Sequence, residues 1–329
     1  MELRIIKDLK KNNKMKPKIN MPTRLLTLHI CLIGCMLLLQ ANLHAQDSTQ
    51  ATTEEVAAPV KVKPAKNTFS GIWLIDNQTV MVPIKGTFEM DIMHRFGTLK
   101  NGYSDFWGFF APSNIRLGFE YVPINNLMIG VSITKANMTW EGYGKYAIIK
   151  QTKGKYPVSV TYFGDVAYDT RKDADKSLFK YTTQRISFFN QVIIARKVTN
   201  KLSVQVAPSL SHYNAVNGYY TKNDSTGKVI FKEMQNDHFA IAVSARYKLK
   251  DAMAVIVNYD QPITKHNTNN PSPNISVGLE LTTSAHAFQF FLGNYGSITP
   301  QRNNYSNHND PHFISQYLIG FNITRLWNY

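Results

Sequence analysis

Apolar and polar residues alternate at every second position along much of the chain after residue 86. Successive residues of a β-strand point to opposite faces, so this period predicts strands with one apolar and one polar face. The clearest segments are 88–92, 115–121, 127–134, 158–162, 202–211, 238–247 and 274–281. Weaker alternation at 140–150, 185–197, 253–259, 287–294 and 317–327 completes a prediction of about twelve strands.

The connections between these strands fall into two length classes. Five of them are tight, at 122–126, 151–156, 198–201, 249–251 and 283–285. They alternate with connections that are long except for one near Asn137, and the long ones lie at 97–112, 169–181, 213–236, 260–273 and 295–312. Short turns at one end and long loops at the other, on an even strand count, are typical of bacterial outer-membrane barrels.

The fold class that follows is all-β, a closed antiparallel transmembrane β-barrel with short periplasmic turns and long extracellular loops. Closure is required because hydrocarbon cannot satisfy the hydrogen bonds of a free strand edge. A soluble periplasmic β-sandwich would also alternate, and it is the alternative fold. Small residues on the polar faces and aromatic residues near strand ends, such as Tyr121, Tyr247 and Trp327, favour the membrane.

The first 45 residues have the layout of a cleavable signal peptide. A basic stretch up to Arg24 leads into the 15-residue apolar run 25–39, and a polar segment follows Ala45. The basic stretch is long for a leader, so Met15 or Met21 is an alternative start. A membrane anchor is a second interpretation, although roughly 20 apolar residues are needed to span a bilayer. A lipoprotein acylated at Cys35 is a third.

Three further regions follow the leader. Residues 46–68 are polar and contain Pro59 and Pro64, which predicts a disordered periplasmic linker. Residues 69–85 include apolar side chains and have two interpretations: a plug in the barrel lumen, or a docking segment for a periplasmic partner through residues 69–82. We favour docking, because the polar faces of the strands predict a polar lumen. Residues 86–329 are the expected barrel.

The formal charge of +15 raises the question of nucleic-acid binding. Residues 1–45 hold eight basic and two acidic residues, a net +6, which leaves +9 on the remainder. Those cations are spread over turns and strand ends, whereas a nucleic-acid site needs a clustered patch. Anionic lipid headgroups account for the charge, and we expect no nucleic-acid partner. Because Cys31 and Cys35 are the only cysteines, thiol chemistry and disulfides are excluded after cleavage.

Three short motifs resemble a known family. They are His94-Arg95-Phe96-Gly97, Ile115-Arg116-Leu117-Gly118-Phe119 and Ile194-Ala195-Arg196-Lys197. With them, the region 69–329 is similar to a family of uncharacterised membrane β-barrel domains from Bacteroidetes-type bacteria, known only as a domain of unknown function. The resemblance implies an outer-membrane barrel and supplies no activity, ligand or catalytic residue.

Two groups of charged residues are candidate sites. Glu89 and Asp91 should lie across a strand pair from Arg116 and Glu120, so all four would point into the lumen. Such charges either tune solute selectivity or pair with one another, and we favour pairing because an unpaired charge in low dielectric is costly. The basic pair His94 and Arg95 precedes a long loop, where it would contact lipopolysaccharide phosphates or anchor the barrel at the interface.

Two further sets of residues, one at the end of a strand and one in a loop, suggest chemistry that we rank lower. Ser211, His212 and Asn214 are the residue types of a lipid hydrolase, but adjacent strand residues point to opposite faces. His308, Asp310 and His312 have period-two spacing and suit a divalent cation, although they lie in an Asn-rich loop. Gly142 and Gly144 match no nucleotide motif.

The sequence therefore predicts an outer-membrane β-barrel of a Gram-negative bacterium that serves as a small channel or a binding barrel. We expect no enzymatic activity and no cofactor. The alternatives are a lipid-modifying enzyme and a passive anchor for a periplasmic or surface partner. The expected partners are outer-membrane lipid and the barrel-assembly machinery, which would read the C-terminal aromatic residue Tyr329.

Overall fold

The computed structural model describes residues 63–223, 225–266 and 269–328, and these form a closed antiparallel barrel of twelve strands. In chain order the strands are β3 (Thr87–Thr98), β4 (Asn114–Ile124), β5 (Leu127–Thr134), β6 (Thr139–Ile149), β7 (Ser159–Asp169), β8 (Ile186–Lys197), β9 (Leu202–Tyr213), β12 (Asp237–Lys250), β13 (Met253–Pro262), β14 (Asn274–Thr282), β15 (His286–Gly293) and β16 (Leu318–Asn328). Each strand pairs with its neighbour in sequence, and β16 closes the ring on β3. The predicted fold class and strand count are confirmed.

The two faces of each strand have the predicted polarity. In β12, Val243 is 45% exposed on the outer wall, whereas Ser244 is buried inside and donates a hydrogen bond to Asn258. The same alternation leaves Val131, Val277 and Phe290 exposed on other strands. An apolar outer band of this kind matches the hydrocarbon of a membrane.

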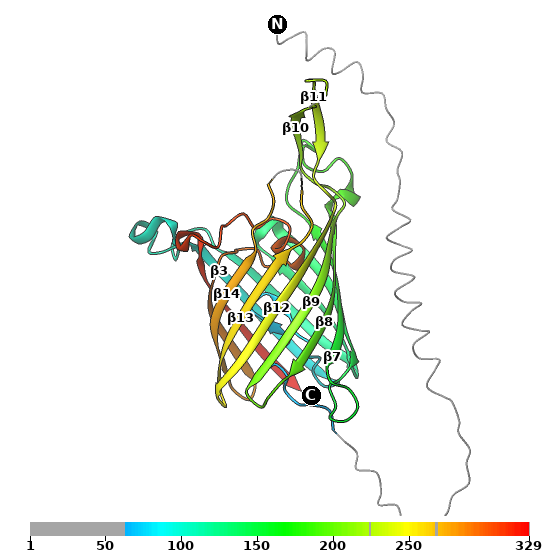
Figure 1. Ribbon diagram of the computed structural model, residues 1–329, viewed down its shortest axis with the longest axis vertical. Helices are drawn as coiled ribbons and strands as arrows, with labels where there is room; N and C mark the ends of the chain where they lie inside the picture. The colour runs from blue at the N-terminus through cyan, green and yellow to red at the C-terminus, as the bar shows by residue number, and fades with distance from the viewer. Residues whose placement is uncertain (1–62, 224, 267–268, 329) are drawn as a thin grey trace, which may run out of the picture. The chain divides into compact units, whose positions relative to one another are not determined.

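The connections are divided between the two ends of the barrel, as predicted. The five short ones lie at the end where β3 begins and β16 ends, which we name the turn end (Figure 1). The opposite, loop end has the long connections and most of the small elements: η1 (Leu99–Asp105), η2 (Ala136–Met138), η3 (Thr182–Arg185), β10 (Gly218–Lys222), β11 (Val229–Glu233), α3 (Pro300–Asn303) and η4 (Ile314–Gln316). The β10–β11 hairpin projects beyond the barrel in Figure 1. No helix in the described residues is long and apolar enough to cross a membrane.

A short hairpin occupies the lumen ahead of the first wall strand. It pairs β1 (Trp73–Leu74) with β2 (Asn77–Gln78), and its side chains are buried against lumen-facing residues of the wall. We name residues 69–82 the plug. In the described structure this segment lies inside the lumen, as in the plug interpretation, and docking of residues 69–82 to a periplasmic partner stays a prediction.

The end of the predicted linker is also ordered where the structure describes it. Pro64 bridges to Thr152 in the β6–β7 turn, and the Ala65 amide donates to the Gln151 carbonyl over 2.7 Å. Lys197 adds a bond from its ammonium group to the Lys66 carbonyl. Residues 63–68 are thus fixed at the turn end, unlike the disordered linker predicted for them.

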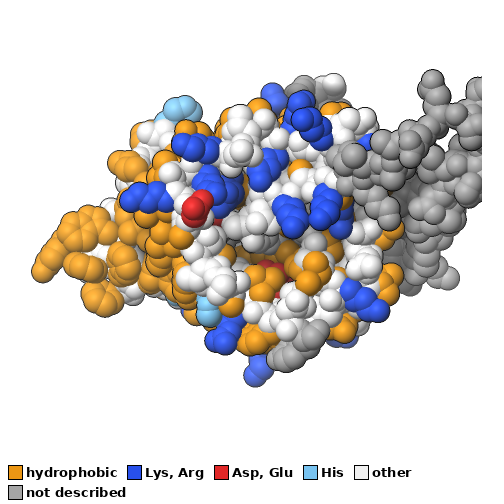
Figure 2. Space-filling model, turned by 90° about the horizontal axis from the view of Figure 1, so that it is seen from below, with side chains coloured by type: hydrophobic (Ala, Val, Ile, Leu, Met, Phe, Trp, Pro, Cys, Tyr) orange, Lys and Arg blue, Asp and Glu red, His pale blue; other side chains and the backbone are white. Residues whose placement is uncertain are grey.

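Basic side chains surround the turn end, as Figure 2 shows. They include Lys153, Lys155, Lys201, Lys248 and Lys250, and Lys248 pairs with the exposed Asp251. The predicted leader, its alternative start residues, Cys31 and Cys35, and the terminal Tyr329 lie outside the described residues.

Candidate functional site

The plug turns back on itself at Ile75 and Asp76, between β1 and β2. Ile75 has a φ of 61°, a left-handed conformation that is unfavourable for a β-branched residue. The wall holds it there through its backbone: Gln289 accepts from the Ile75 amide over 2.9 Å, and Asn322 donates to the Ile75 carbonyl. Strain of this kind persists only where surrounding contacts over-determine the backbone. The turn of the plug is therefore built to fit this lumen.

Asp76 lies at the centre of a buried polar network. Its carboxylate accepts hydrogen bonds from the Tyr295 hydroxyl, from Asn303 of α3 over 2.6 Å and from Asn258 of β13 over 3.2 Å. Burial raises the pKa of Asp76 to about 6, although the bonds from Tyr295 and Asn303 and the nearby Arg95 oppose the shift. The carboxyl group therefore joins the plug to the wall and to the loop end at a single point.

The next two plug residues continue these contacts around the barrel. The Asn77 amide donates to Asn258 over 2.9 Å and to Asp260 over 2.8 Å. Gln78 accepts from the Lys145 ammonium group over 2.7 Å, and its carbonyl accepts from Gln205 over 2.7 Å. Because each bond joins two buried groups, removing one partner would cost about 1–3 kcal/mol.

The plug also packs apolar side chains against the wall, so the expectation of a polar lumen, on which the preference for docking rested, does not hold here. Trp73 lies edge-on to Phe163 of β7, with 6.5 Å between ring centroids. Phe163 belongs to a belt of apolar side chains on the inner face, which also contains Met93, Met128, Phe189, Ile193, Ile256 and Phe291. The lumen is therefore apolar at this level, and it matches the apolar residues of the plug.

The lumen is closed where the plug meets α3. The cavity left between them has a volume of about 10 Å³ and is lined by Asp76, Asn77, Asn303 and neighbouring side chains. A space of this size holds at most about one water molecule. The plug and α3 therefore leave almost no free space between them at this level of the lumen.

Of the four residues in the predicted charge cluster, two form an ion pair with each other and two do not. Glu89, Asp91, Arg116 and Glu120 are all buried and face inward. Arg116 bonds to Asp91 over 2.7 Å and to Glu141, which the sequence analysis missed, over 3.1 Å. The Arg116 guanidinium also lies 4.8 Å from the Trp73 ring, so the cluster contacts the plug.

The other two acids of that cluster make no ion pair with any residue that the structure describes. Glu120 accepts from the Tyr143 hydroxyl, and neither carboxylate oxygen of Glu89 has a hydrogen-bond partner in the described part of the chain. Pairing, the interpretation that we favoured, therefore describes Asp91 and Arg116 but not Glu89 and Glu120. Within the same described residues, no group of three or more His, Asp or Glu side chains is arranged to hold a metal ion.

The pair His94 and Arg95 cannot form one surface site. His94 faces outward and stacks on Phe321 at 5.0 Å between ring centroids. Arg95 is fully buried in the lumen, where it donates to Asn322 over 2.8 Å and lies over the Phe291 ring. The expected lipopolysaccharide contact by both residues is wrong, because neighbouring strand positions point to opposite faces.

The residues of the hydrolase hypothesis do not form a nucleophile and base pair. His212 bonds to Asp237 over 2.8 Å and to Asn214 over 3.1 Å, while the Ser211 hydroxyl has no partner among the described residues. Two residues of the predicted cation site, His312 and Asp310, bond to each other. The His312 side chain is exposed, and that of Asp310 is half-exposed.

Sequence reasoning missed the polar network around Asp76. One signal was present, since the polar run 76–79 interrupts the apolar segment 69–82. Asn258 and Asp260 also lie in the inward phase of β13. Tyr295 and Asn303 lie in the connection between β15 and β16, where no strand period indicates which side chains turn inward.

Comparison with known proteins agrees with the barrel. Residues 69–327 match a family described as a membrane bound beta barrel domain (DUF5777), and the chain belongs to this family. No curated protein matches the chain. The similar solved structures include an outer membrane channel from Pseudomonas putida F1 (11% identity, 75% of this chain and 97% of that one, TM-score 0.43). They also include the NanC porin (10%, 74% and 99%, 0.41) and the KdgM porin (10%, 73% and 99%, 0.39). At these identities the likeness is one of fold.

Proposed function

We propose that this membrane-bound barrel is a gated channel for small polar solutes in the outer membrane of a Gram-negative bacterium, exported by a cleavable signal peptide at residues 1–45. The turn end then faces the periplasm and the loop end faces outward, the usual orientation of such barrels. The plug is the gate, and its presence in the lumen defines the closed state.

The observation that carries this proposal is the independence of the wall from the plug. The hydrogen-bonded ring of twelve strands closes from β16 to β3 without any residue before Thr87. The plug precedes that ring in the chain, and the link between them contains Gly86, with a φ of 86°. Displacing the plug therefore breaks no strand pairing.

The contacts of the plug are also suited to reversible release. The polar groups of Asp76, Asn77 and Gln78 would exchange their wall partners for water. Such exchanges have a small net free energy, because each lost bond is replaced by one to solvent. Burial of Trp73 and its apolar neighbours opposes release, so the closed state is favoured and openings are infrequent until a solute, or a periplasmic partner acting on residues before Phe69, favours the open state.

The test is the conductance of planar bilayers that contain the barrel. Residues 69–82 are replaced by a Gly/Ser segment of equal length, which keeps the tether but removes the side chains that fill the lumen. We expect the protein with the Gly/Ser segment to have a larger single-channel conductance and more frequent openings than the natural chain. Equal conductance in the two proteins would show that the plug does not control passage.

The same samples provide the control for folding. Closed barrels resist detergent until heated, so both proteins should migrate faster on unboiled gels than on boiled ones. Any difference in conductance between them can then be attributed to the lumen.

A further inference from the structure

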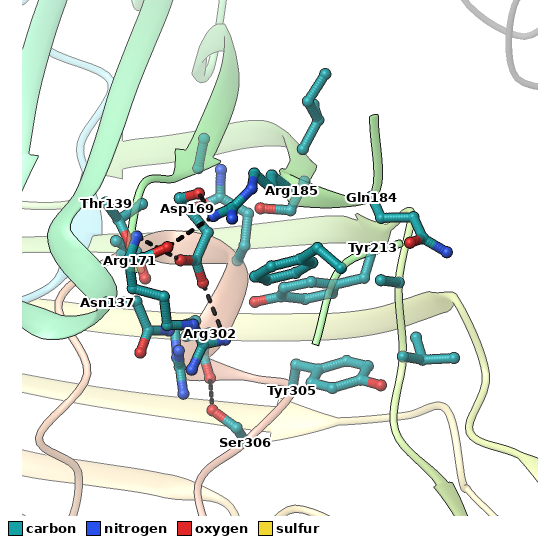
Figure 3. A pocket seen from close by; sticks show the side chains of 18 of the residues that line it. Asn137, Thr139, Asp169, Arg171, Gln184, Arg185, Tyr213, Arg302, Tyr305 and Ser306 are labelled. Carbon is teal, nitrogen blue, oxygen red and sulfur yellow. Dashed lines mark hydrogen bonds and ion pairs between the residues drawn. The ribbon is translucent and has the colours of Figure 1, made fainter. Parts of the chain in front are cut away.

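A pocket of about 160 Å³ opens among the segments of the loop end. Its lining comes from the β5–β6, β7–β8, β9–β10 and β15–β16 connections and from adjacent strand ends, as Figure 3 shows in close-up. The pocket differs from the lumen site already described, because no plug residue lines it. A volume of about 150 Å³ holds a six-membered ring, so this pocket admits one small solute.

The charge of the pocket is strongly one-sided. Three arginines, Arg171, Arg185 and Arg302, line it, and Asp169 is the only acid among the lining residues. Asp169 pairs with Arg171 over 3.0 Å. The Arg302 guanidinium makes no ion pair or hydrogen bond within the described part of the chain, so at least one positive charge remains uncompensated.

Two of the arginines are held in place by one aromatic ring. Phe179 lies 4.7 Å from the Arg185 guanidinium and 5.4 Å from that of Arg171. One terminal nitrogen of Arg185 also donates to the carbonyls of Asp169 and Arg171, each over 2.9 Å. These contacts fix the planar donors before a ligand arrives, which reduces the entropy lost on binding.

The opposite wall supplies neutral polar and aromatic groups. The rings of Tyr213 and Tyr305 lie 4.5 Å apart, and both side chains line the pocket (Figure 3). Four buried oxygen atoms lack hydrogen-bond partners in the described residues. They are the hydroxyls of Tyr213, Tyr305 and Thr299 and the side-chain amide oxygen of Gln301. Buried polar groups are seldom left unpaired, so small shifts of these side chains would let them bond a polar solute.

We propose that this pocket binds a small hydroxylated organic anion, whose carboxylate or phosphate contacts Arg302 and Arg185 while its hydroxyl groups contact the neutral wall. Guanidinium groups bind both oxyanions with paired hydrogen bonds, so the two kinds of ligand share one chemistry. The Arg171 side chain is 38% exposed, so the pocket is accessible from outside.

The site also contacts the gate. Gln301 and Arg302 of α3 line the pocket, and Asn303 of the same short helix donates to Asp76 of the plug. A ligand that moved α3 would therefore disturb the plug. This role as the entry site of the channel rests on the proposed function, whereas binding itself does not.

The experiment measures binding to the full-length purified protein in detergent by isothermal titration calorimetry. The probes are glucuronate, glucose 6-phosphate and glucose, which share a ring and differ in charge. The variants are Arg302→Gln and the matched control Lys172→Gln, which removes the same charge from an exposed neighbouring position outside the pocket.

We expect at least one charged sugar to bind at least ten times more tightly than glucose. Arg302→Gln should weaken that binding at least tenfold, and Lys172→Gln should change it less than twofold. The ratio of the two charged sugars distinguishes a carboxylate site from a phosphate site. Equal binding of all three probes, no binding of any, or equal effects of the two variants would overturn the proposal. Because no conductance is measured, any of these results would leave the channel proposal standing.

Discussion

The depth of a side chain in the membrane determines which substitutions the outer wall tolerates. Val243 is exposed near the middle of β12, whereas Leu249 is exposed at its turn end between Lys248 and Lys250. We predict that Val243→Arg lowers the free energy of unfolding by about 2–4 kcal/mol and Leu249→Arg by about 0–1 kcal/mol. Urea unfolding in lipid vesicles measures both. Equal losses would show that β12 does not cross hydrocarbon as assigned.

The Asp76 carboxyl group should make the gate sensitive to pH. Its pKa is about 6 in the closed state because of burial, and it returns to the ordinary value of 3.8 when the plug is displaced into water. The cost of burying the charged form is fully present above pH 6, and it is lost as the pH falls toward 3.8. Acid therefore stabilises the closed state.

We predict that the open probability falls between pH 7 and pH 4.5, and that Asp76→Asn, which imitates the protonated form, stays at the low value across this range. Single-channel recording at symmetrical pH measures both. The charged and titratable groups around Asp76 are Arg95, Tyr295 and Asp260, none of which is changed. Opening by acid, or an unchanged pH response in Asp76→Asn, would refute the role of this carboxyl group.

His94 and Arg95 show how far single residues could be predicted. The alternation places them on opposite faces, and the same rule correctly separates Ser211 from His212 in the hydrolase hypothesis. Treating the basic pair as one surface site ignored that rule. Glu141, in contrast, was missed because the weaker strand 140–150 was not assigned an inner and an outer face, so its carboxylate had no predicted partner.

At the scale of elements, α3 is the part of the loop end that touches the plug. The Asn303 amide donates to Asp76 over 2.6 Å, while the oxygen of the Asn303 side chain has no partner in the described residues. Hydrogen bonds to a charged group contribute about 1.5–3 kcal/mol. This contact is therefore strong enough to bias the gate.

We predict that Asn303→Ala raises the ratio of open to closed time about tenfold or more, measured in planar bilayers at pH 7 where Asp76 is largely charged. Asn304→Ala is the matched control, because Asn304 directly follows α3 and is also buried, but within the described residues it donates no bond to the plug. An equal change in both variants would indicate a general loosening of the loop rather than this contact.

The position of the plug was hard to predict because it depends on a few inward-facing apolar residues. Phe163 and Phe189 occupy inward positions of strands in which other inward residues, Asp165 and Gln191, are polar. Within a single strand, one apolar residue on the inner face looks like an exception to the alternation of polar and apolar residues. Only the closed barrel brings these side chains from several strands to one level, where they match Trp73 and its neighbours.

At the scale of the whole molecule, the sequence was sufficient for the architecture. Strand number, turn and loop lengths and the direction of most side chains follow from local alternation, since each strand pairs with its neighbour in sequence. The state of the lumen depends on contacts between residues far apart in the sequence, such as Asn77 with Asn258, which are 181 positions apart. No local pattern encodes such a contact.

The claim that the plug is a gate is tested most directly by fixing it reversibly in place. Asn77 and Asn258 are in contact, with 2.9 Å between their amide nitrogen and oxygen, and the chain has no cysteine after residue 35. Cysteines at both positions can therefore be joined selectively by a short reducible bis-thiosulfonate linker, with Asn258→Cys alone as the control for the reagent.

Conductance of the doubly substituted protein is then recorded in one bilayer before and after addition of reductant. We predict no channel openings while the linker joins the plug to β13, and openings once the linker is cleaved, with the single-cysteine control unaffected throughout. Openings of the same size and frequency with the linker intact would contradict the account, because the solute path would then not depend on the plug.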